Sequence, residues 1–343
     1  MRMQNIKGLI FLILSFCVGA ISLQAQQDKK KVMIAFYNVE NLFDTIHEPD
    51  KFDEEFTPKG NKEWGSERYQ NKLNNLAKVI SSMNDGKGPD VLGMCEVENF
   101  RVLKDLVNTP ALKKLGYGIV HIESRDQRGI DNALLYKEDV LPWISFTTLP
   151  VPLPDSVPPT RDIMFIQSEI EGYPIEFIVC HFPSRSEGQA QSEYKRVAAA
   201  KVVKHVVESL LAVDEKDNIL IMGDFNDEPT DSSMLNIIGG VNPDVKQKAK
   251  LFNLMYPLKN KGLGSYKYRD DWNMLDQIIV SGGMLTELNG LRYSKESVGI
   301  FAEEWMKQTE PKYFGSPLRT FGGPKYLAGY SDHFPVYITI EVK

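Results

Sequence analysis

The segment Ile219-Leu220-Ile221-Met222-Gly223-Asp224-Phe225-Asn226-Asp227 is an apolar run that ends at a glycine and then at polar residues. A short apolar run of this kind predicts a buried strand. Alternate side chains share one face of a strand, so Asp224 and Asn226 are expected to point the same way. The end of this strand would then offer a carboxylate to hold a water and an amide to hold an oxyanion. A strand followed by an ordinary polar turn explains the same residues, so the rest of the chain must decide.

The same arrangement of an apolar strand with a polar end recurs along the chain. Further strands are expected at residues 32–37, 90–95, 175–180 and 334–342. The polar residues next to the five strands are Asn38, Glu96, His181, Asp224 with Asn226, and Asp332 with His333. Asp276 is expected inside a sixth strand, residues 274–280. One polar end of this kind is an ordinary turn, but six together indicate a shared site.

The oxygen-bearing residues at these ends suit a metal ion. If the strand ends meet, Glu96, Asn38 and Asp332 would form an oxygen-rich site. Hard oxygen ligands without a thiol suit Mg²⁺, Mn²⁺ or Ca²⁺ rather than zinc. A divalent cation, Mg²⁺ first, is therefore the expected cofactor.

The histidines at these ends suit a phosphate group. His181 and His333 would supply hydrogen-bond donors for its oxygens. Asp276 could orient His333 and favour the charged form of its ring. His205, in a helix expected at residues 189–212, is given no role because a histidine in such a place is more often a surface or packing residue.

The composition of the 343-residue chain is that of an ordinary globular protein, with a formal net charge of −6. This acidity argues against strong non-specific binding to a phosphate backbone, although it leaves room for a local basic patch. Residues 1–25 resemble a secretory signal, with Arg2 and Lys7 before an apolar run and Ala25 before the expected cleavage. Export to the periplasm or outside the cell is the prediction. A lipoprotein anchor at Cys17 is disfavoured because the bulky Phe16 precedes it.

The remaining cysteines, Cys95 and Cys180, lie at the ends of apolar runs. No CxxC pair is present, which disfavours a zinc site. Free buried thiols are expected, with a disulfide as the alternative in an oxidising compartment.

Helices should cover the sheets, because strands alternate with helices and the strands are nearly all apolar. A helix is expected from Ser66 to about Met83. Residues 47–64 are expected to form a surface loop, and residues 287–328 a long loop without regular structure. No domain boundary stands out, so residues 26–343 are predicted to form a single domain and a monomer without a membrane span.

Six segments together resemble the endonuclease/exonuclease/phosphatase superfamily, which includes deoxyribonuclease I. They occur in the order of that family over residues 32–343. The segments are Tyr37-Asn38-Val39-Glu40-Asn41-Leu42, Cys95-Glu96-Val97-Glu98-Asn99, Cys180-His181-Phe182-Pro183-Ser184, Met222-Gly223-Asp224-Phe225-Asn226, Leu275-Asp276-Gln277-Ile278 and Gly329-Tyr330-Ser331-Asp332-His333-Phe334-Pro335-Val336. The resemblance implies an α/β four-layer sandwich, in which two mixed β-sheets pack face to face with helices on the outside. It also implies a divalent-metal-dependent phosphoester hydrolase.

The resemblance assigns a role to each matching residue. Glu96 would be the main metal ligand, with Asn38 and Asp332 nearby, and Glu40 matches an acidic position near a second metal. Asp224 would orient and deprotonate the attacking water. The residues expected to hold the scissile phosphate are Asn226, His181 and His333, with Asp276 paired to His333.

One stretch fits the family loosely. The tyrosine that some nucleases carry in their middle strand is not evident in Arg128-Gly129-Ile130-Asp131-Asn132-Ala133-Leu134. Arg128 could bind the phosphate instead, with a surface ion pair as the alternative. Arg185 and Arg319 are expected to grip a second phosphate of the substrate, unless they are solvated.

Three functions remain open at this level. A secreted nuclease or phosphodiesterase acting on DNA or RNA is the first. The second is a phosphatase for a small phosphomonoester, an inositol phosphate or a lipid head group. An inactive binding module on the same fold is disfavoured, because a lost activity should leave gaps among the six segments.

Overall fold

A computed structural model describes residues 29–246, 248–286 and 289–343. The expected signal segment, residues 1–25, and Cys17 lie outside the described residues. Among the helices that are described, none is long and apolar enough to cross a membrane.

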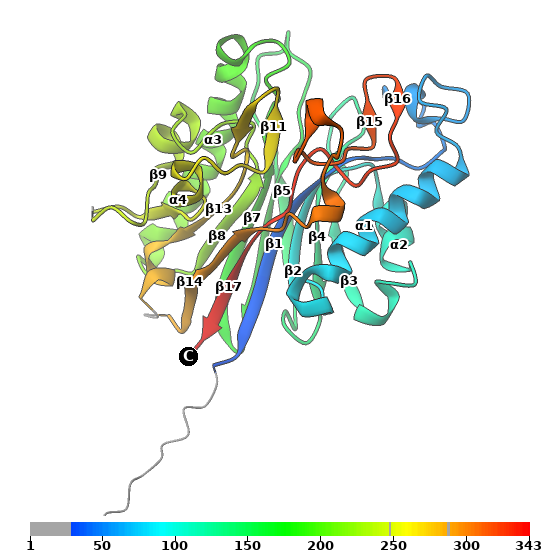
Figure 1. Ribbon diagram of the computed structural model, residues 1–343. Coiled ribbons are helices and arrows are strands. Elements are labelled where there is room, and N and C mark those ends of the chain that lie inside the picture. Colours follow the sequence, from blue (N-terminus) through cyan, green and yellow to red (C-terminus); the bar gives the residue numbers. More distant parts are fainter. Residues whose placement is uncertain (1–28, 247, 287–288) are drawn as a thin grey trace, which may run out of the picture.

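Two large sheets form the centre of the molecule (Figure 1). The first has six strands in the order β14 (Leu291–Ile300), β17 (Val336–Val342), β1 (Lys31–Leu42), β2 (Val91–Val97), β4 (Asp131–Lys137) and β3 (Tyr117–His121). The second has seven strands in the order β5 (Ser145–Leu149), β6 (Ile163–Ile170), β7 (Tyr173–His181), β8 (Ile219–Asp224), β13 (Asp276–Ser281), β10 (Leu251–Asn253) and β9 (Gly240–Val241). Both sheets are mixed, because β1–β2, β7–β8 and β9–β10 run parallel while their other neighbouring strands are antiparallel.

The core between the sheets is built from alternate residues of their strands. Ile34 and Phe36 from β1 share one buried cluster with Leu220 and Met222 from β8. Burying a side chain of this size stabilises the fold by about 1.5–3 kcal/mol. Gly93 on β2 faces Met222, whose Sδ would lie 2.8 Å from an added Cβ. The absent side chain therefore lets the two sheets approach closely at this point.

Helices cover the outer faces, so the predicted four-layer sandwich is confirmed. The first sheet packs against α1 (Ser66–Gly86) and α2 (Phe100–Val107), and the second packs against α3 (Gln189–Val213) (Figure 1). Asn99 caps α2, because its side chain accepts a hydrogen bond from the amide of Val102 at 3.1 Å. The regular turns of α1 end at Met83, where ψ is 162°. A short helix, α4 (Tyr256–Asn260), and several single helical turns complete the described part.

The prediction of a loop without regular structure at residues 287–328 is wrong. Strand β14 lies inside this segment, where it pairs antiparallel with β17 at the edge of the first sheet. The apolar alternation is weak there, because Ser294 to Ser297 are polar and the register shifts between Ser294 and Gly299. A short hairpin, β15 (Phe321–Gly322) and β16 (Lys325–Tyr326), follows in the same segment.

Another hairpin, β11 (Tyr266–Tyr268) and β12 (Asp271–Asn273), lies in the connection before β13. The sequence indicated no regular structure in that connection. Asp276 is the first residue of β13 and does not lie inside it, because the described strand begins two residues later than predicted.

Candidate active site

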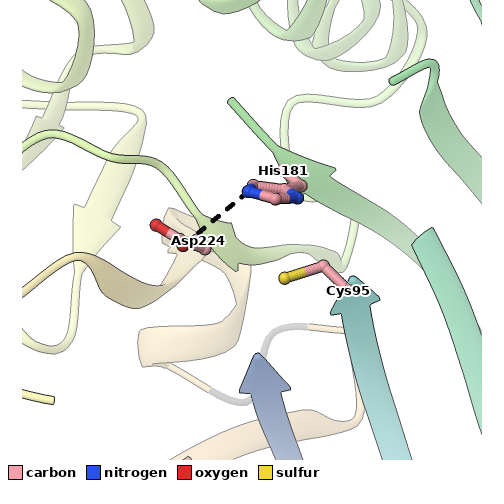
Figure 2. A group of neighbouring side chains, drawn as sticks. All are labelled: Cys95, His181 and Asp224. Atoms are coloured by element: carbon pink, nitrogen blue, oxygen red, sulfur yellow. Dashed lines mark ion pairs between the residues drawn. The ribbon is translucent and has the colours of Figure 1, made fainter. Parts of the chain in front are cut away.

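His181 and Asp224 end two adjacent parallel strands on the side that faces the other sheet. The residues two positions earlier on each strand belong to the core between the sheets, so strand alternation directs both side chains inward. In register, His181 lies opposite Asp224, and Asp224 lies opposite Asp276 of β13. Figure 2 shows His181 and Asp224 pointing toward one another, with the thiol of Cys95 nearby. Three strand ends of the second sheet therefore meet at one place.

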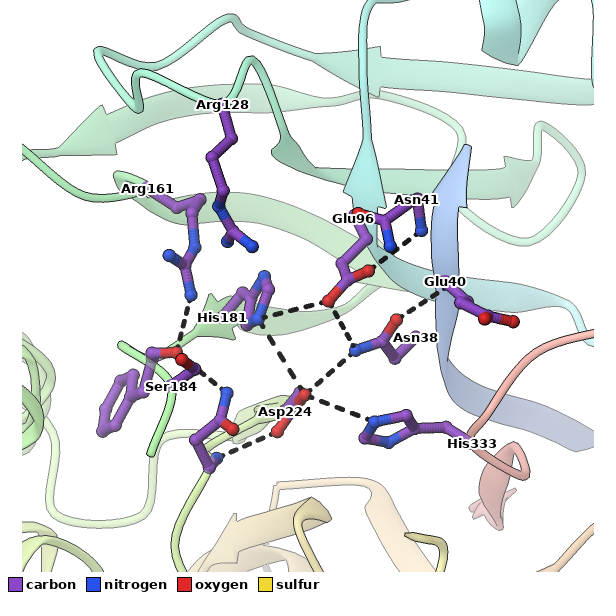
Figure 3. Close-up of polar contacts among 12 residues, drawn as sticks. Asn38, Glu40, Asn41, Glu96, Arg128, Arg161, His181, Ser184, Asp224 and His333 are labelled. Atoms are coloured by element: carbon purple, nitrogen blue, oxygen red, sulfur yellow. Dashed lines mark hydrogen bonds and ion pairs between the residues drawn. The ribbon is translucent and has the colours of Figure 1, made fainter. Parts of the chain in front are cut away.

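Asn38 links this place to the first sheet (Figure 3). Its Nδ2 donates a hydrogen bond to Asp224 Oδ2 at 3.0 Å and another to Glu96 Oε1 at 3.3 Å. Its Oδ1 accepts a hydrogen bond from the amide of Glu40 at 2.9 Å. The other oxygen of Glu96, Oε2, accepts from the amide of Asn41 at 2.9 Å. Asn38 thus holds one carboxylate of each sheet in place.

Several site residues have a left-handed backbone. The φ angle is 62° at Glu96 and 50° at both Glu40 and Asn226. Such a conformation costs about 1–3 kcal/mol in a non-glycine residue and is common at active sites. At Glu96 it interrupts the strand alternation, and the pairing of β2 shifts register between Cys95 and Val97. Consecutive residues, Cys95 and Glu96, can therefore both lie at the site.

The two buried histidines differ in charge. Burial alone would lower the pKa of His333, but Asp276, Asp224 and Asp332 raise it well above its ordinary value. The strongest of these contacts joins His333 Nδ1 to Asp276 Oδ2 at 2.6 Å. Burial lowers the pKa of His181 well below its ordinary value, and nearby positive charges add to the effect. The surroundings therefore favour the charged form of His333 and the neutral form of His181.

The carboxylates of the site suit a divalent cation. Burial raises the pKa of Glu96, and the negative charge of Asp332 raises it further. Burial also raises the pKa of Asp224, although His333 opposes this rise. Crowded, buried carboxylates repel one another, and a bound cation would relieve that repulsion. The donor set fits a hard metal, with Glu96 and Asp332 as the carboxylates that could hold it.

These groups line one cavity of about 610 Å³. The predicted site residues that line it are Glu96, Arg128, His181, Arg185, Asp224, Asn226, Asp332 and His333. Asn38 and Asp276 are not part of the lining, and they reach the site through Asp224 and His333. Most of the polar strand ends singled out from the sequence thus meet around one cavity.

Glu40 points away from this cavity (Figure 3). Its Oε2 accepts a hydrogen bond from the amide of Thr320 at 2.7 Å and lies 3.9 Å from Nζ of the buried Lys72. Lys72 Nζ in turn donates to Thr320 Oγ1 and to the carbonyl of Tyr330, each at 2.7 Å. The pair fixes the segment that leads to Asp332. Glu40 therefore does not line the cavity, although burial and the negative charge of Asp332 both raise its pKa.

The three predicted arginines lie in different surroundings. Arg128 lines the cavity with a side chain that is 47% exposed, and its Nε forms the alternative ion pair with Asp126 Oδ1 at 3.7 Å. Arg185 also lines it, but its guanidinium lies 2.6 Å from Asp231 Oδ2 and donates to the carbonyl of Asn226 at 2.5 Å. Arg319 Nη2 donates to Asp332 Oδ2 at 2.6 Å. Arg185 and Arg319 are therefore neutralised by carboxylates of the same chain.

One wall of the cavity was not predicted. The hairpin β11–β12 turns four side chains toward the cavity, and these are Tyr266, Tyr268, Asp271 and Asn273. The Tyr266 ring lies 4.8 Å from the His333 ring, measured between centroids. Two three-residue segments without an apolar run flank the two-residue turn Arg269-Asp270, in which φ of Arg269 is 56°, so no pattern of the sequence marked this hairpin.

Arg161 is a second group that the sequence did not reveal. It is 5% exposed and lies just before β6. Its Nη2 donates to the carbonyl of Phe182 at 2.7 Å, and Asn226 Nδ2 donates to the same carbonyl at 3.0 Å. Its positive charge also contributes to the lowered pKa of His181. Arg161 thus supports two predicted phosphate-binding residues without lining the cavity.

Solved structures with a similar fold cover almost the whole chain. D. rerio TDP2 complexed with a single-strand DNA product has a TM-score of 0.56 at 13% identity, over 91% of this chain and 99% of that chain. A mannosyl-6-phosphatase from Bacteroides thetaiotaomicron has a TM-score of 0.53 at 16% identity, over 90% and 99%. An endonuclease/exonuclease/phosphatase family protein from the same organism has a TM-score of 0.53 at 16% identity, over 92% and 99%. At this identity the likeness shows the fold.

A search of the curated proteins gives no significant match to the chain. A family model described as "Endonuclease/Exonuclease/phosphatase family" matches residues 33–342. The match spans both sheets and every residue of the site described above. The chain belongs to the endonuclease/exonuclease/phosphatase family.

Proposed function

We propose that the chain is a divalent-cation-dependent phosphoester hydrolase in which a water molecule attacks phosphorus directly. The proposal rests on two buried histidines, one raised and one lowered in pKa, that meet the carboxylates of Glu96, Asp224 and Asp332 around one cavity. Neighbouring titratable groups whose pKa values are shifted in opposite directions by their surroundings are typical of acid–base sites. The shared cavity of Glu96, His181, Asp224, Asn226, Asp332 and His333 supports an active enzyme rather than an inactive binding module.

The roles follow from the contacts. Asp224 orients and deprotonates the water, since its raised pKa suits a general base and Asn38 holds its Oδ2. The charged His333, the neutral His181 and the amide of Asn226 donate hydrogen bonds to the phosphate oxygens. Asp276 keeps His333 charged and fixes its orientation.

The cation is proposed to be Mg²⁺, with Mn²⁺ or Ca²⁺ as alternatives. Glu96 and Asp332 would hold it, and Asn38 would hold Glu96 in position. The bound cation would stabilise the charge that develops on the phosphate oxygens. No side chain needs to form a covalent intermediate.

A phosphodiester of DNA or RNA is the first substrate class, supported by the similar fold of TDP2 complexed with single-strand DNA product. A small phosphomonoester is the second, and two observations favour it. Arg185 and Arg319, expected to grip a second phosphate, are both neutralised by carboxylates. The hairpin β11–β12 also adds tyrosines, a carboxylate and an amide to one wall, and such groups can bind sugar hydroxyls.

A hydrolysis panel tests the proposal. Single-stranded DNA, RNA, an aryl phosphodiester, hexose phosphates, inositol phosphates and sphingomyelin would each be incubated with Mg²⁺ and with chelator. We expect hydrolysis of at least one class with Mg²⁺, its loss in chelator and its return on adding Mg²⁺. His181→Ala should lower that rate by about 10²- to 10⁴-fold. Full turnover after extensive dialysis against chelator would contradict the metal assignment.

Export and a monomeric single domain, residues 26–343, complete the proposal. Export depends on the signal-like residues 1–25. Mass spectrometry of the protein from the medium or periplasm should give an N-terminus near residue 26. Light scattering should give the mass of one chain.

A further inference from the structure

Cys95 lies beneath the candidate active site. It is fully buried on β2, and its side chain belongs to the core between the sheets. Its Sγ, one ring nitrogen of His181 and one carboxylate oxygen of Asp224 lie within 4.8 Å of one another. The three residues come from three strands, β2, β7 and β8, and converge in Figure 2. The sequence placed no thiol among the metal ligands.

The imidazole of His181 is free to bind a metal. Its Nε2 lies 3.9 Å from both Asp224 Oδ2 and Glu96 Oε1, which is beyond hydrogen-bond reach. Its Nδ1 is buried and has no hydrogen-bond partner among the described residues. A buried polar nitrogen without a partner is rare in folded proteins. Around this ring the carboxylates of Glu96 and Asp224 face the positive charges of Arg161, Arg128 and His333, and a bound metal would add to the positive side of that balance.

We propose that Cys95, His181 and Asp224 form a site for a soft divalent transition metal, with Zn²⁺ as the first candidate. Thiolate, imidazole and carboxylate are the usual ligands of Zn²⁺, and three protein ligands leave a fourth position for water. The thiol proton passes to solvent as the sulfur–metal bond forms. Mg²⁺ does not compete for this set, because it avoids sulfur ligands.

Binding requires a small contraction of the three side chains. Zn–ligand bonds of about 2.0–2.3 Å place tetrahedral ligand atoms roughly 3.3–3.8 Å apart. The present separations are within 4.8 Å. Each ligand atom would have to move by up to about an ångström to close the site.

Occupancy of this site should inhibit hydrolysis. His181 and Asp224 are the groups proposed to hold the phosphate and to activate the water, and a metal bound to both removes them from those roles. This consequence depends on the proposed function, whereas metal binding itself does not. The site would thus make the enzyme sensitive to thiol-binding metals that do not support its reaction.

Cys180 provides a matched control. It is also a free, buried thiol, and it directly precedes His181 on β7. Its side chain lies on the opposite face of the sheet, in the cluster that packs against α3. A metal that binds the proposed site should ignore Cys180.

The test uses Co²⁺ as a spectroscopic probe on the full chain without Mg²⁺. Wild type and Cys180→Ser should show the near-ultraviolet charge-transfer band of a cobalt–thiolate bond, and Cys95→Ser should lack it. Zn²⁺ should displace Co²⁺, and calorimetry should show Zn²⁺ binding at least about tenfold weaker in Cys95→Ser, since even loss of a group that supports a metal ligand costs about 10- to 100-fold. No band in wild type, or a band that Cys95→Ser retains, overturns the proposal.

Two further measurements complete the test. X-ray absorption of the wild-type zinc complex should show one sulfur neighbour at about 2.3 Å, and its absence overturns the proposal even if Cys95→Ser does not fold. Zn²⁺ should also inhibit the Mg²⁺-supported reaction of wild type and of Cys180→Ser equally. A sulfur-bound metal that leaves hydrolysis unaffected would support the site and contradict the catalytic roles proposed for His181 and Asp224.

Discussion

His333 Nδ1 lies 2.6 Å from Asp276 Oδ2, and the two residues are 57 positions apart in the chain. Ser265 Oγ donates to the same carboxylate oxygen at 2.5 Å. Asp276 is fully buried and His333 is 5% exposed. The two residues therefore form a buried ion pair. The other ring nitrogen of His333, Nε2, lies 3.9 Å from Asp224 Oδ2.

Truncating His333 and Asp276 together should cost much less turnover than the product of the two single effects. Once His333→Ala has removed the imidazole, Asp276→Ala has no ring left to orient. The measurement is a double-mutant cycle on kcat with one substrate of the panel. Strictly multiplicative losses would show that the two residues act independently.

Arg185→Ala should lower kcat on every substrate of the panel. Arg185 holds the backbone of Asn226 through its carbonyl and is itself held by Asp231, so its loss should displace the Asn226 amide. Arg128→Ala should instead raise KM, because Arg128 reaches the cavity with a half-exposed side chain whose ion pair with Asp126 is 3.7 Å long. A change of substrate preference in Arg185→Ala without a loss of kcat would show that Arg185 binds the substrate directly.

Tyr268→Ala and Asp271→Ala should change the order of preference across the panel. Both side chains line the cavity, while Lys267 on the same hairpin does not. Hydrolysis of a minimal aryl phosphodiester should be spared, because such a substrate lacks groups that reach the hairpin. Lys267→Ala is the control, and equal effects of all three substitutions would remove the hairpin from substrate selection.

Breaking the buried pair of Glu40 and Lys72 should destabilise the protein. Burial raises the pKa of Glu40 to about 7 and lowers the pKa of Lys72 to about 8, so each charge depends on the other. Removing one partner of such a pair costs about 3–5 kcal/mol, because the other charge is left buried. Urea unfolding of Glu40→Gln and Lys72→Met should show this loss, and the double variant should lose less than the sum. Additive losses would argue against the pairing.

Glu176→Gln should gain stability relative to wild type as pH rises. Burial and Asp217 raise the pKa of Glu176 from 4.5 to about 7. Between these values the folded chain holds a proton that the unfolded chain has released, so wild type loses stability as pH rises through this window, by up to about 1.4 kcal/mol per unit. Urea unfolding at about pH 4.5 and pH 7.5 measures the change. The control is Glu208→Gln at a side chain that is 59% exposed, and a parallel response of both variants would contradict the assignment.

The sequence by itself determined most of the strands, and the resemblance of six of its segments to one family implied the two-sheet fold and the candidate site residues. Short apolar runs can be found locally, and they placed His181 and Asp224 at the ends of two strands. Segments without that pattern were missed. Strand β14 is polar at the edge of a sheet, and the hairpin β11–β12 has a single tryptophan to mark its buried side.

Tertiary structure decided which of these residues act together. Glu40 and Glu96 are both acidic residues near strand ends, yet they have different partners. Glu40 pairs with Lys72, while Glu96 is linked to Asp224 by the side chain of Asn38, which donates hydrogen bonds to both carboxylates. The difference arises from local left-handed turns and from segments far away in the sequence, such as Thr320. The packing of the two sheets likewise places the thiol of Cys95 next to His181 and Asp224. No local pattern encodes such contacts, because they depend on how two sheets, each stabilised by its own alternation, pack against one another.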